Sequence, residues 1–235
     1  MRLDRFVASN SGLSRKDATL AIRAGRVFVD NARCKKSNFA TIDGQCIQLD
    51  GIALCEPTPI YWMLNKPQGS VCANSDADHP TVFDLIDLSQ LHPSHQQGLQ
   101  VAGRLDIDTT GLVLITSDGD WNHAITSPNK TLGKRYRVTT AAPISTEALA
   151  QLRAGILLRN ESTATKPAKV TLLTENSCLL EITEGRYHQV KRMLAATGNK
   201  VVALHREAIA GIELDAALLP GEHRPLTPAE AALAQ

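Results

Sequence analysis

The sequence of 235 residues lacks any apolar run that approaches the roughly 18 residues of a membrane-spanning helix. Its first residues, MRLDRFVASN, lack the apolar core of a secretory signal peptide, so we expect a cytoplasmic protein with no membrane partner. The five cysteines include no C-x-x-C pair, which argues against a disulfide framework or a zinc site. His92 and His95 have no third ligand nearby, and we assign them to an exposed polar loop over 88–99. We therefore expect no bound metal.

The chain as a whole also lacks an excess of one charge, because 25 Lys and Arg stand against 24 Asp and Glu. The charge is nevertheless uneven. Residues 1–60 hold nine basic against six acidic side chains, whereas the other 175 residues hold sixteen against eighteen. A small basic head on a near-neutral body favours a module that binds a polyanion, although so small an excess also fits a solvated surface.

The basic head predicts two short helices followed by short strands. Apolar residues recur at helical spacing within residues 2–10. The stretch SRKD at 14–17 has the form of a capping box, and it starts a second helix that ends near Gly25. RVFVD at 26–30 alternates as a strand. Further strands are expected around 39–42 and 46–49.

Four basic side chains cluster at the two ends of the second expected helix. They are Arg15, Lys16, Arg23 and Arg26. A helix N-terminus flanked by basic groups suits phosphate, whereas from charge alone a solvated helical face fits equally well. The order RLDRF…SRKDATLAIRAGRVFVD resembles the alpha-L, or S4-like, RNA-binding module. This resemblance implies that the four side chains contact RNA.

Two prolines mark the change from head to body. Pro57 and Pro59 disfavour regular structure, so we expect a linker there and domains over 1–59 and 60–235. The second domain does not follow a strict strand–helix–strand order, which favours an α+β fold with a mixed, largely antiparallel sheet flanked by helices. Strands are expected at 60–64, 112–116, 134–140, 170–174, 178–183 and 201–204. Helices are expected at 81–87, 119–126, 145–153, 187–197 and 227–234.

The stretch GRLDIDTTGLVLITSDG at 103–119 places Asp106 and Asp108 directly before an apolar run. On an extended chain these residues face the same way, about 7 Å apart, which suits a pair of catalytic acids. A working pair usually comes from opposite walls of a cleft, however. From the residues alone, the leading interpretation is an Asp106 that pairs with Arg104 or caps a turn. A pair of acids and a single nucleophile remain open.

Further motifs favour a single nucleophile. GRLDIDTTGL closely resembles the aspartate-containing signature of the pseudouridine synthases that act on ribosomal RNA. Four more stretches match this family in order: LNKPQG at 64–69, KRYRV at 134–138, EGRYHQVKRM at 184–193 and GEHRPLT at 221–227. The resemblance, with the basic head, covers nearly the whole chain. It implies an isomerase without a cofactor. The reaction only moves the attachment of ribose from a ring nitrogen of uracil to carbon-5 of the same base.

The resemblance also implies roles for individual side chains. Asp106 is expected to be the nucleophile, acting by attack on ribose or by removal of a proton to give a glycal. Asp108 is expected to be a turn residue or a residue that supports the catalytic side chains. Tyr136 is expected to stack on the flipped base and to assist removal of the carbon-5 proton. Lys191 is expected to orient Asp106 and keep it ionised, at a position where many relatives carry arginine.

Five further side chains of the second domain are predicted to contact RNA: Arg104, Lys66, Arg186, His188 and Arg192. Arg104 is expected to bind phosphate or to help displace the base. On the helix expected over 187–197, His188 and Arg192 share one face with Lys191. Because a basic helical face is usually solvated, only the family motif favours these assignments.

The predicted function is the conversion of one uridine of 16S ribosomal RNA to pseudouridine, with that nucleotide flipped out of its stack. The substrate is either naked RNA or a partly assembled small subunit, and a monomer is expected because no surplus apolar stripe calls for a partner. Three alternatives remain: the same chemistry on 23S ribosomal RNA, a non-catalytic RNA-binding protein, and a hydrolase using Asp106 with Asp108. The joint presence of Asp106, Tyr136 and Lys191 argues against a non-catalytic protein.

Overall fold

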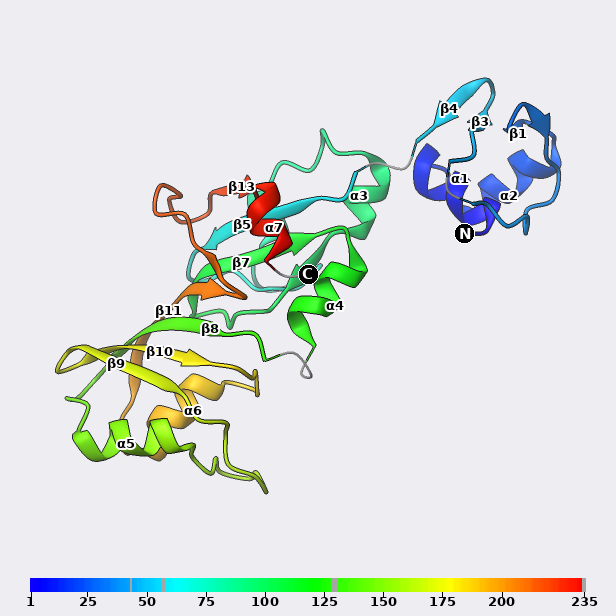
Figure 1. Ribbon diagram of the computed structural model, residues 1–235. Coiled ribbons are helices and arrows are strands. Elements are labelled where there is room, and N and C mark those ends of the chain that lie inside the picture. The colour runs from blue at the N-terminus through cyan, green and yellow to red at the C-terminus, as the bar shows by residue number, and fades with distance from the viewer. Residues whose placement is uncertain (43, 56–57, 128–130, 234–235) are drawn as a thin grey trace. The chain divides into compact units, whose positions relative to one another are not determined.

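The computed structural model describes residues 1–42, 44–55, 58–127 and 131–233 (Figure 1). The chain forms two compact units, of which the first comprises Met1–Pro59 with Leu88–Leu99 and the second Ile60–Asp87 with Gln100–Gln235. Leu88–Leu99 thus belongs to the first unit although it lies inside the second predicted domain, and the functional domain limits 1–59 and 60–235 remain a proposal. Pro57 of the predicted linker lies outside the described residues. No helix in the described ranges is long and apolar enough to cross a membrane.

The part of the first unit before Pro59 combines two helices with a four-stranded antiparallel sheet of order β2-β1-β3-β4. The helices are α1 (Leu3–Ser11) and α2 (Arg15–Arg23). The strands are β1 (Val27–Val29), β2 (Ala32–Arg33), β3 (Ile47–Leu49) and β4 (Ile52–Leu54). A buried apolar cluster joins both helices to the sheet through Leu3, Phe6, Val7, Ala18, Ile22, Val27, Val29 and Ile47. This packing stabilises helices of nine residues, which are marginal in isolation.

Both predicted helices of the head and its first predicted strand are confirmed. Ser14 caps α2 by accepting a hydrogen bond from the backbone N–H of Asp17 at 3.1 Å, and the Ser14 hydroxyl donates to the Asp17 carboxylate. The strand predicted around 39–42 is wrong. Its backbone bonds to the start of the chain instead, where the Leu3 N–H donates to the Phe39 carbonyl at 2.8 Å, so the segment does not join the sheet.

The polar stretch 88–99 is not the exposed loop that its composition predicts. It contains the helix α3 (Pro93–Gly98), which contacts α1 within the first unit. His95 is only 8% exposed, and its burial lowers the pKa of the imidazole. A polar segment can cover a neighbouring helix as well as face solvent, so composition alone does not reveal this packing.

The second unit is built on a nine-stranded sheet of order β13-β5-β7-β11-β8-β10-β9, with β6 paired to β7 and β12 to β11. The strands are β5 (Tyr61–Lys66), β6 (Gln100–Ala102), β7 (Thr110–Thr116), β8 (Lys134–Thr140), β9 (Lys169–Thr174), β10 (Ser177–Ile182), β11 (Val201–Ile209), β12 (Ile212–Glu213) and β13 (His223–Pro225). Among these strands only the β7–β11 pair is parallel, so the predicted mixed, largely antiparallel sheet is confirmed.

Four helices accompany this sheet at positions close to the predicted ranges. They are α4 (Gly119–Thr126), α5 (Thr146–Ala154), α6 (Gln189–Ala196) and α7 (Pro228–Ala232). α5 contacts β9 and α6 contacts β11 (Figure 1). Thr227 and Glu230 form the capping box expected at the start of α7, while residue 234 of the predicted helix lies outside the described residues. The helix predicted at 81–87 is wrong, because only a single 3-10 turn forms at Phe83–Leu85.

The close pairing of β7 with β11 depends on Gly111. This residue has a φ of +101°, and a Cβ atom there would lie 2.3 Å from the carbonyl oxygen of Arg206. A side chain at this position would therefore force the two strands apart. Because Gly111 lies near the start of β7, this approach also fixes the chain directly after the loop that carries Asp106 and Asp108.

Candidate active site

The loop between β6 and β7 carries Asp106 and is held by a buried lysine. Lys66, the last residue of β5, is 0% exposed, and its ammonium donates to the carbonyls of Pro67 (3.0 Å), Ile107 (3.3 Å) and Thr109 (2.8 Å). Burial lowers the pKa of this ammonium. This geometry does not support the predicted contact of Lys66 with RNA on the rim, because its ammonium donates to the backbone. Lys66 instead fixes the path of the loop around its aspartates.

A second buried cation, Arg206 on β11, holds the start of the same loop and the strand β7 that follows it. The residue is 1% exposed, and its guanidinium donates to the carbonyls of Gly103 (2.6 Å), Arg104 (3.5 Å) and Leu112 (2.8 Å). Sequence reasoning missed Arg206. The available signal was its position in β11, where strand alternation places it among inward-facing apolar residues.

Two predicted site residues, Tyr136 and Arg104, are neighbours of Arg206. Tyr136 on β8 is the register partner of Arg206 on β11, so the two side chains lie on the same face of the sheet. Tyr136 is buried at 7% exposure, whereas Arg104 is exposed at the start of the loop. The stacking role of Tyr136 and the RNA contact of Arg104 remain predictions.

Asp106 meets two side chains at the start of α6. The Lys191 ammonium donates to its Oδ2 at 2.8 Å, and His188 Nε2 lies 3.4 Å from its Oδ1. The Asp106 side chain is 31% exposed, so solvent reaches the carboxylate while the ammonium orients it. Asp108 accepts a hydrogen bond from the same ammonium at 2.5 Å and is 56% exposed. The structure thus brings together Asp106 and Lys191 as the sequence predicts.

The shared ammonium sets the charge of this site. Burial works against the charge of Lys191, but its hydrogen bonds to Asp106 and Asp108 raise its pKa above the ordinary value. The same hydrogen bond lowers the pKa of Asp108. At neutral pH Lys191 is therefore a cation and Asp108 an anion. Asp108 is thus a counter-ion of Lys191, an arrangement that fits the predicted supporting role as well as a turn.

The start of α6 brings His188 against the carboxylate. His188 has a left-handed backbone with a φ of +48°, and α6 begins at Gln189 instead of at 187 as predicted. His188 was predicted to contact RNA on the rim. Its Nε2 atom instead lies beside Asp106, at the centre of the site.

Arg186 and Arg192, both predicted RNA contacts, share the carboxylate of Glu161. The Arg186 guanidinium lies 3.2 Å from Glu161 and that of Arg192 lies 2.9 Å from it. Their remaining hydrogen bonds go to Glu184 and to the carbonyls of Thr163, Ala164, Arg159 and Tyr187. Because these donors are engaged within the protein, the geometry does not support the predicted RNA contacts. Arg192 pairs with Glu161, whereas His188 and Lys191 both contact Asp106.

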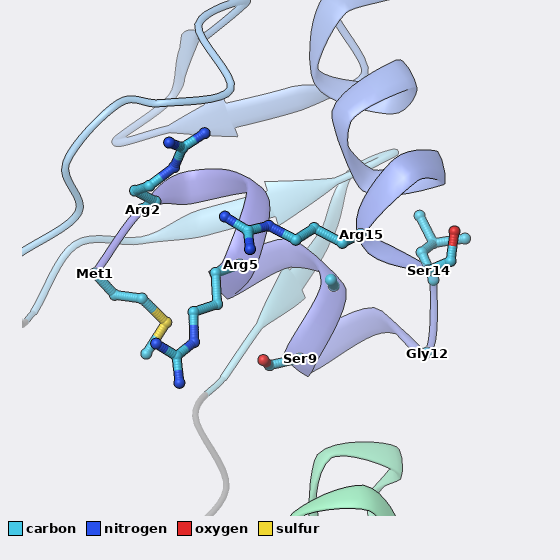
Figure 2. A pocket seen from close by; sticks show the side chains of 9 residues that line it. Met1, Arg2, Arg5, Ser9, Gly12, Ser14 and Arg15 are labelled. Carbon is cyan, nitrogen blue, oxygen red and sulfur yellow. The ribbon is translucent and has the colours of Figure 1, made fainter.

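The first unit contains a basic cavity of about 730 Å³ between α1 and the start of α2 (Figure 2). Arg2, Arg5 and Arg15 contribute to its lining, and Figure 2 shows the Arg15 side chain extending from α2 across α1. Asp4 is the nearby anion, at 2.8 Å from the Arg2 guanidinium and 3.7 Å from that of Arg15. Arg5 has no ion pair among the described residues. Sequence reasoning had singled out Arg15 but not Arg2 or Arg5.

The other predicted basic residues of the head differ in whether an acidic side chain already pairs with them. Lys16 and Arg23 are exposed on α2. Arg26 is also exposed, but its guanidinium makes two short contacts to Asp50, at 2.5 and 2.9 Å. Its charge is therefore already compensated, and Lys16 and Arg23 are better placed than Arg26 to meet an external phosphate.

The fold and the site together define the class of the protein. Residues 60–196 match the family described as RNA pseudouridylate synthase, and residues 1–40 match the S4 domain. The chain belongs to the RNA pseudouridylate synthase family, whose members are isomerases, and it carries an S4 domain at its start. Within the described ranges, no group of three His, Cys, Asp or Glu side chains is arranged to hold a metal ion.

Individual relatives agree with this class. The proteins named Ribosomal small subunit pseudouridine synthase A from Salmonella typhimurium and from Escherichia coli K12 are each 49% identical over 233 residues, which is 99% of this chain and 99% of theirs. A solved structure described as the crystal structure of pseudouridylate synthase is 45% identical, covers all of both chains and gives a TM-score of 0.72. The predicted family and the S4-like head are confirmed.

Proposed function

We propose that this protein converts one uridine of 16S ribosomal RNA to pseudouridine and that Asp106 is its nucleophile. The observation that carries the proposal is the 2.8 Å hydrogen bond from Lys191 to Asp106, in a half-exposed loop of a pseudouridine synthase domain. The choice of 16S RNA is supported by the names of relatives that match over 99% of the chain.

The reaction breaks the bond from ribose carbon-1′ to uracil N1, turns the base and joins carbon-1′ to carbon-5. Carbon-5 loses its proton and N1 gains one, so the product is an isomer of the substrate. The Asp106 carboxylate attacks carbon-1′ and later leaves, or it removes a ribose proton to give a glycal. Both routes need an ionised, oriented carboxylate at this position.

The residues around Asp106 fit these requirements. Lys191 holds the carboxylate in one orientation through its hydrogen bond to Oδ2. When Asp106 loses its charge on bonding to the sugar, Asp108 remains as a counter-ion, so the ammonium stays paired. Tyr136 stacks on the flipped uracil and assists removal of the carbon-5 proton, while Arg104 contacts the RNA beside the loop.

Binding of the RNA backbone is divided between the two units. In the head, Arg15, Lys16 and Arg23 are exposed, and among the described residues the only ion pair of these three is that of Arg15 with Asp4. Lys and Arg side chains that neutralise phosphates release counter-ions and supply most non-specific affinity. We therefore assign a large share of RNA affinity to the head and the chemistry to the second unit. We further propose that the protein acts as a monomer in the cytoplasm, on naked RNA or on a partly assembled small subunit.

Release of tritium from RNA labelled at uracil carbon-5 tests the chemistry, because only formation of the new carbon–carbon bond expels that hydrogen. We expect about one equivalent of tritium from 16S RNA, either free or in a partly assembled small subunit, and none from a 23S transcript. Release from the 23S transcript alone would support the same chemistry on a different substrate. An absence of release from all three RNAs, with RNA still bound, would favour a non-catalytic RNA-binding protein.

Reversal of two head charges is expected to weaken RNA binding. The Arg15→Glu/Lys16→Glu protein should bind RNA more weakly, and the slope of log affinity against log salt should fall by about two, because about one unit is lost per phosphate contact. Filter binding at several salt concentrations measures this slope. Lys169→Glu, which changes a lysine that is 82% exposed on β9, serves as the matched control. An unchanged slope for the double variant would remove these two residues from the RNA interface.

Removal of the charge of Asp108 is expected to have a mild effect. Asp108→Asn keeps the size of the side chain and leaves Lys191 paired with Asp106, so we expect kcat to fall by less than about tenfold. Single-turnover pseudouridine formation at saturating enzyme measures this. A loss as large as that from Asp106→Asn would instead indicate two catalytic acids.

A further inference from the structure

An exposed aromatic ring lies next to the candidate nucleophile. Tyr187 is 77% exposed, the highest value among the large apolar and aromatic side chains that lie at the surface of the described residues. Its ring stacks on that of His188, with centroids 3.8 Å apart and planes inclined by 20°. His188 in turn lies 3.4 Å from Asp106. One face of the tyrosine is therefore covered by the imidazole, and the opposite face is open to solvent beside the site.

The backbone that presents this ring is anchored on both sides. Before it, the Arg186 N–H donates to the Gln189 side chain at 2.8 Å, and the Arg186 guanidinium is bound to Glu161 and Glu184. At Tyr187 itself, the carbonyl accepts a hydrogen bond from Arg192 at 3.2 Å. The ring is thus held in place before any ligand arrives, which reduces the ordering entropy that stacking would otherwise cost.

The next residue holds an uncommon backbone conformation that contributes to this arrangement. His188 has a φ of +48° and a ψ of 34°, a region that costs a side chain with a Cβ atom some free energy. This conformation interrupts the helix at His188. Tyr187 consequently lies outside α6, where its ring can stand over the imidazole instead of packing along a helical surface.

We propose that Tyr187 stacks on the base of a nucleotide that flanks the target uridine, and this inference rests on the proposed function. The target base belongs at Asp106, and the His188 ring separates that carboxylate from the open face of Tyr187. A base that stacks on this face therefore belongs to a neighbouring nucleotide. An exposed aromatic ring near a catalytic carboxylate and its Lys191 ammonium suits a nucleobase, because every base offers a flat apolar face.

The test uses RNA fragments that contain the uridine modified by the wild-type protein, with either neighbouring nucleotide made abasic. Tyr187→Ala is expected to raise KM about tenfold for the normal fragment and to leave kcat within about twofold, because it removes binding made before the chemistry. Tyr187→Phe, which keeps the ring, should restore KM. One of the two abasic fragments should raise KM of the wild-type protein by a similar factor and have little further effect on Tyr187→Ala.

Two additional measurements make the outcome decisive. A 2-aminopurine placed at the sensitive neighbour should be quenched by the wild-type protein and by Tyr187→Phe, but not by Tyr187→Ala. Leu219→Ala changes another side chain that is 65% exposed in the second unit and should leave KM unchanged. An active wild-type protein whose KM is unaffected by Tyr187→Ala, or by both abasic fragments, would contradict this inference alone. A wild-type protein without activity on any RNA would contradict the proposed function as well.

Discussion

The Asp106→Asn protein is expected to form no detectable pseudouridine while it still binds RNA. Asparagine has nearly the same shape but no charge, so it neither attacks carbon-1′ nor removes a ribose proton. Loss of a nucleophile lowers kcat by roughly 10⁴-fold or more in enzymes that depend on one. Pseudouridine can be quantified in nuclease digests of the treated RNA, and binding can be followed by filter retention.

The position of Asp106 favours a variant that stays folded, so RNA binding can serve as the control. The Asp106 side chain is 31% exposed and its carboxylate lies in a loop held by Lys66, so the substitution should not unfold the second unit. RNA affinity within about threefold of wild type would show that only chemistry is lost. Pseudouridine formation by Asp106→Asn at a rate near wild type would overturn the assignment of the nucleophile.

The Arg206→Met protein is expected to lose the most stability among single substitutions near the site. Arg206 is 1% exposed and donates to the carbonyls of Gly103, Arg104 and Leu112. Methionine has a similar length but leaves these buried carbonyls without their donor, and each costs about 1–3 kcal/mol. We expect a loss of about 3 kcal/mol, which lowers the melting temperature of a chain of this size by about 6–12 °C.

Arg137→Met is the matched control for that substitution. Arg137 lies on the neighbouring strand β8, but its side chain is 53% exposed and pairs with Glu207 at the surface. Exposed ion pairs contribute about 0–1 kcal/mol, so the melting temperature should change little. Thermal unfolding followed by circular dichroism compares the two variants. Equal melting temperatures for Arg206→Met and the wild-type protein would show that the buried guanidinium does not hold the loop.

Sequence patterns predicted the elements of the second unit better than its polar core. Periodic apolar residues placed α4, α5 and the strands β8 to β10 within a residue or two, because local alternation and capping decide these elements. Short strands such as β2 and β12, with two residues each, carry too few residues for a pattern. The helix α3 was missed because its packing on α1 is a tertiary contact.

At the candidate site, too, the sequence predicted what local motifs decide and missed what contacts between distant segments decide. The motif GRLD and the basic helix predicted the pairing of Asp106 with Lys191, since both residues lie in recognisable stretches. The motifs did not reveal that Lys66 is buried, because a lysine in a turn-like sequence is usually exposed. Nor did they reveal that Arg186 and Arg192 share Glu161, which lies more than twenty residues earlier. Ion pairs between distant segments depend on the folded chain and leave no local pattern.

The measurement that tests the central claim most directly is the mapping of pseudouridines by carbodiimide-dependent stops of reverse transcription. Purified protein is incubated with 16S and 23S transcripts and with partly assembled small subunits, and Asp106→Asn serves as the inactive control. We predict one new stop in 16S RNA, either free or in the assembling subunit, with the wild-type protein alone. A stop found only in 23S RNA would contradict the proposed substrate, and no stop in any RNA that the protein binds would contradict the proposed activity.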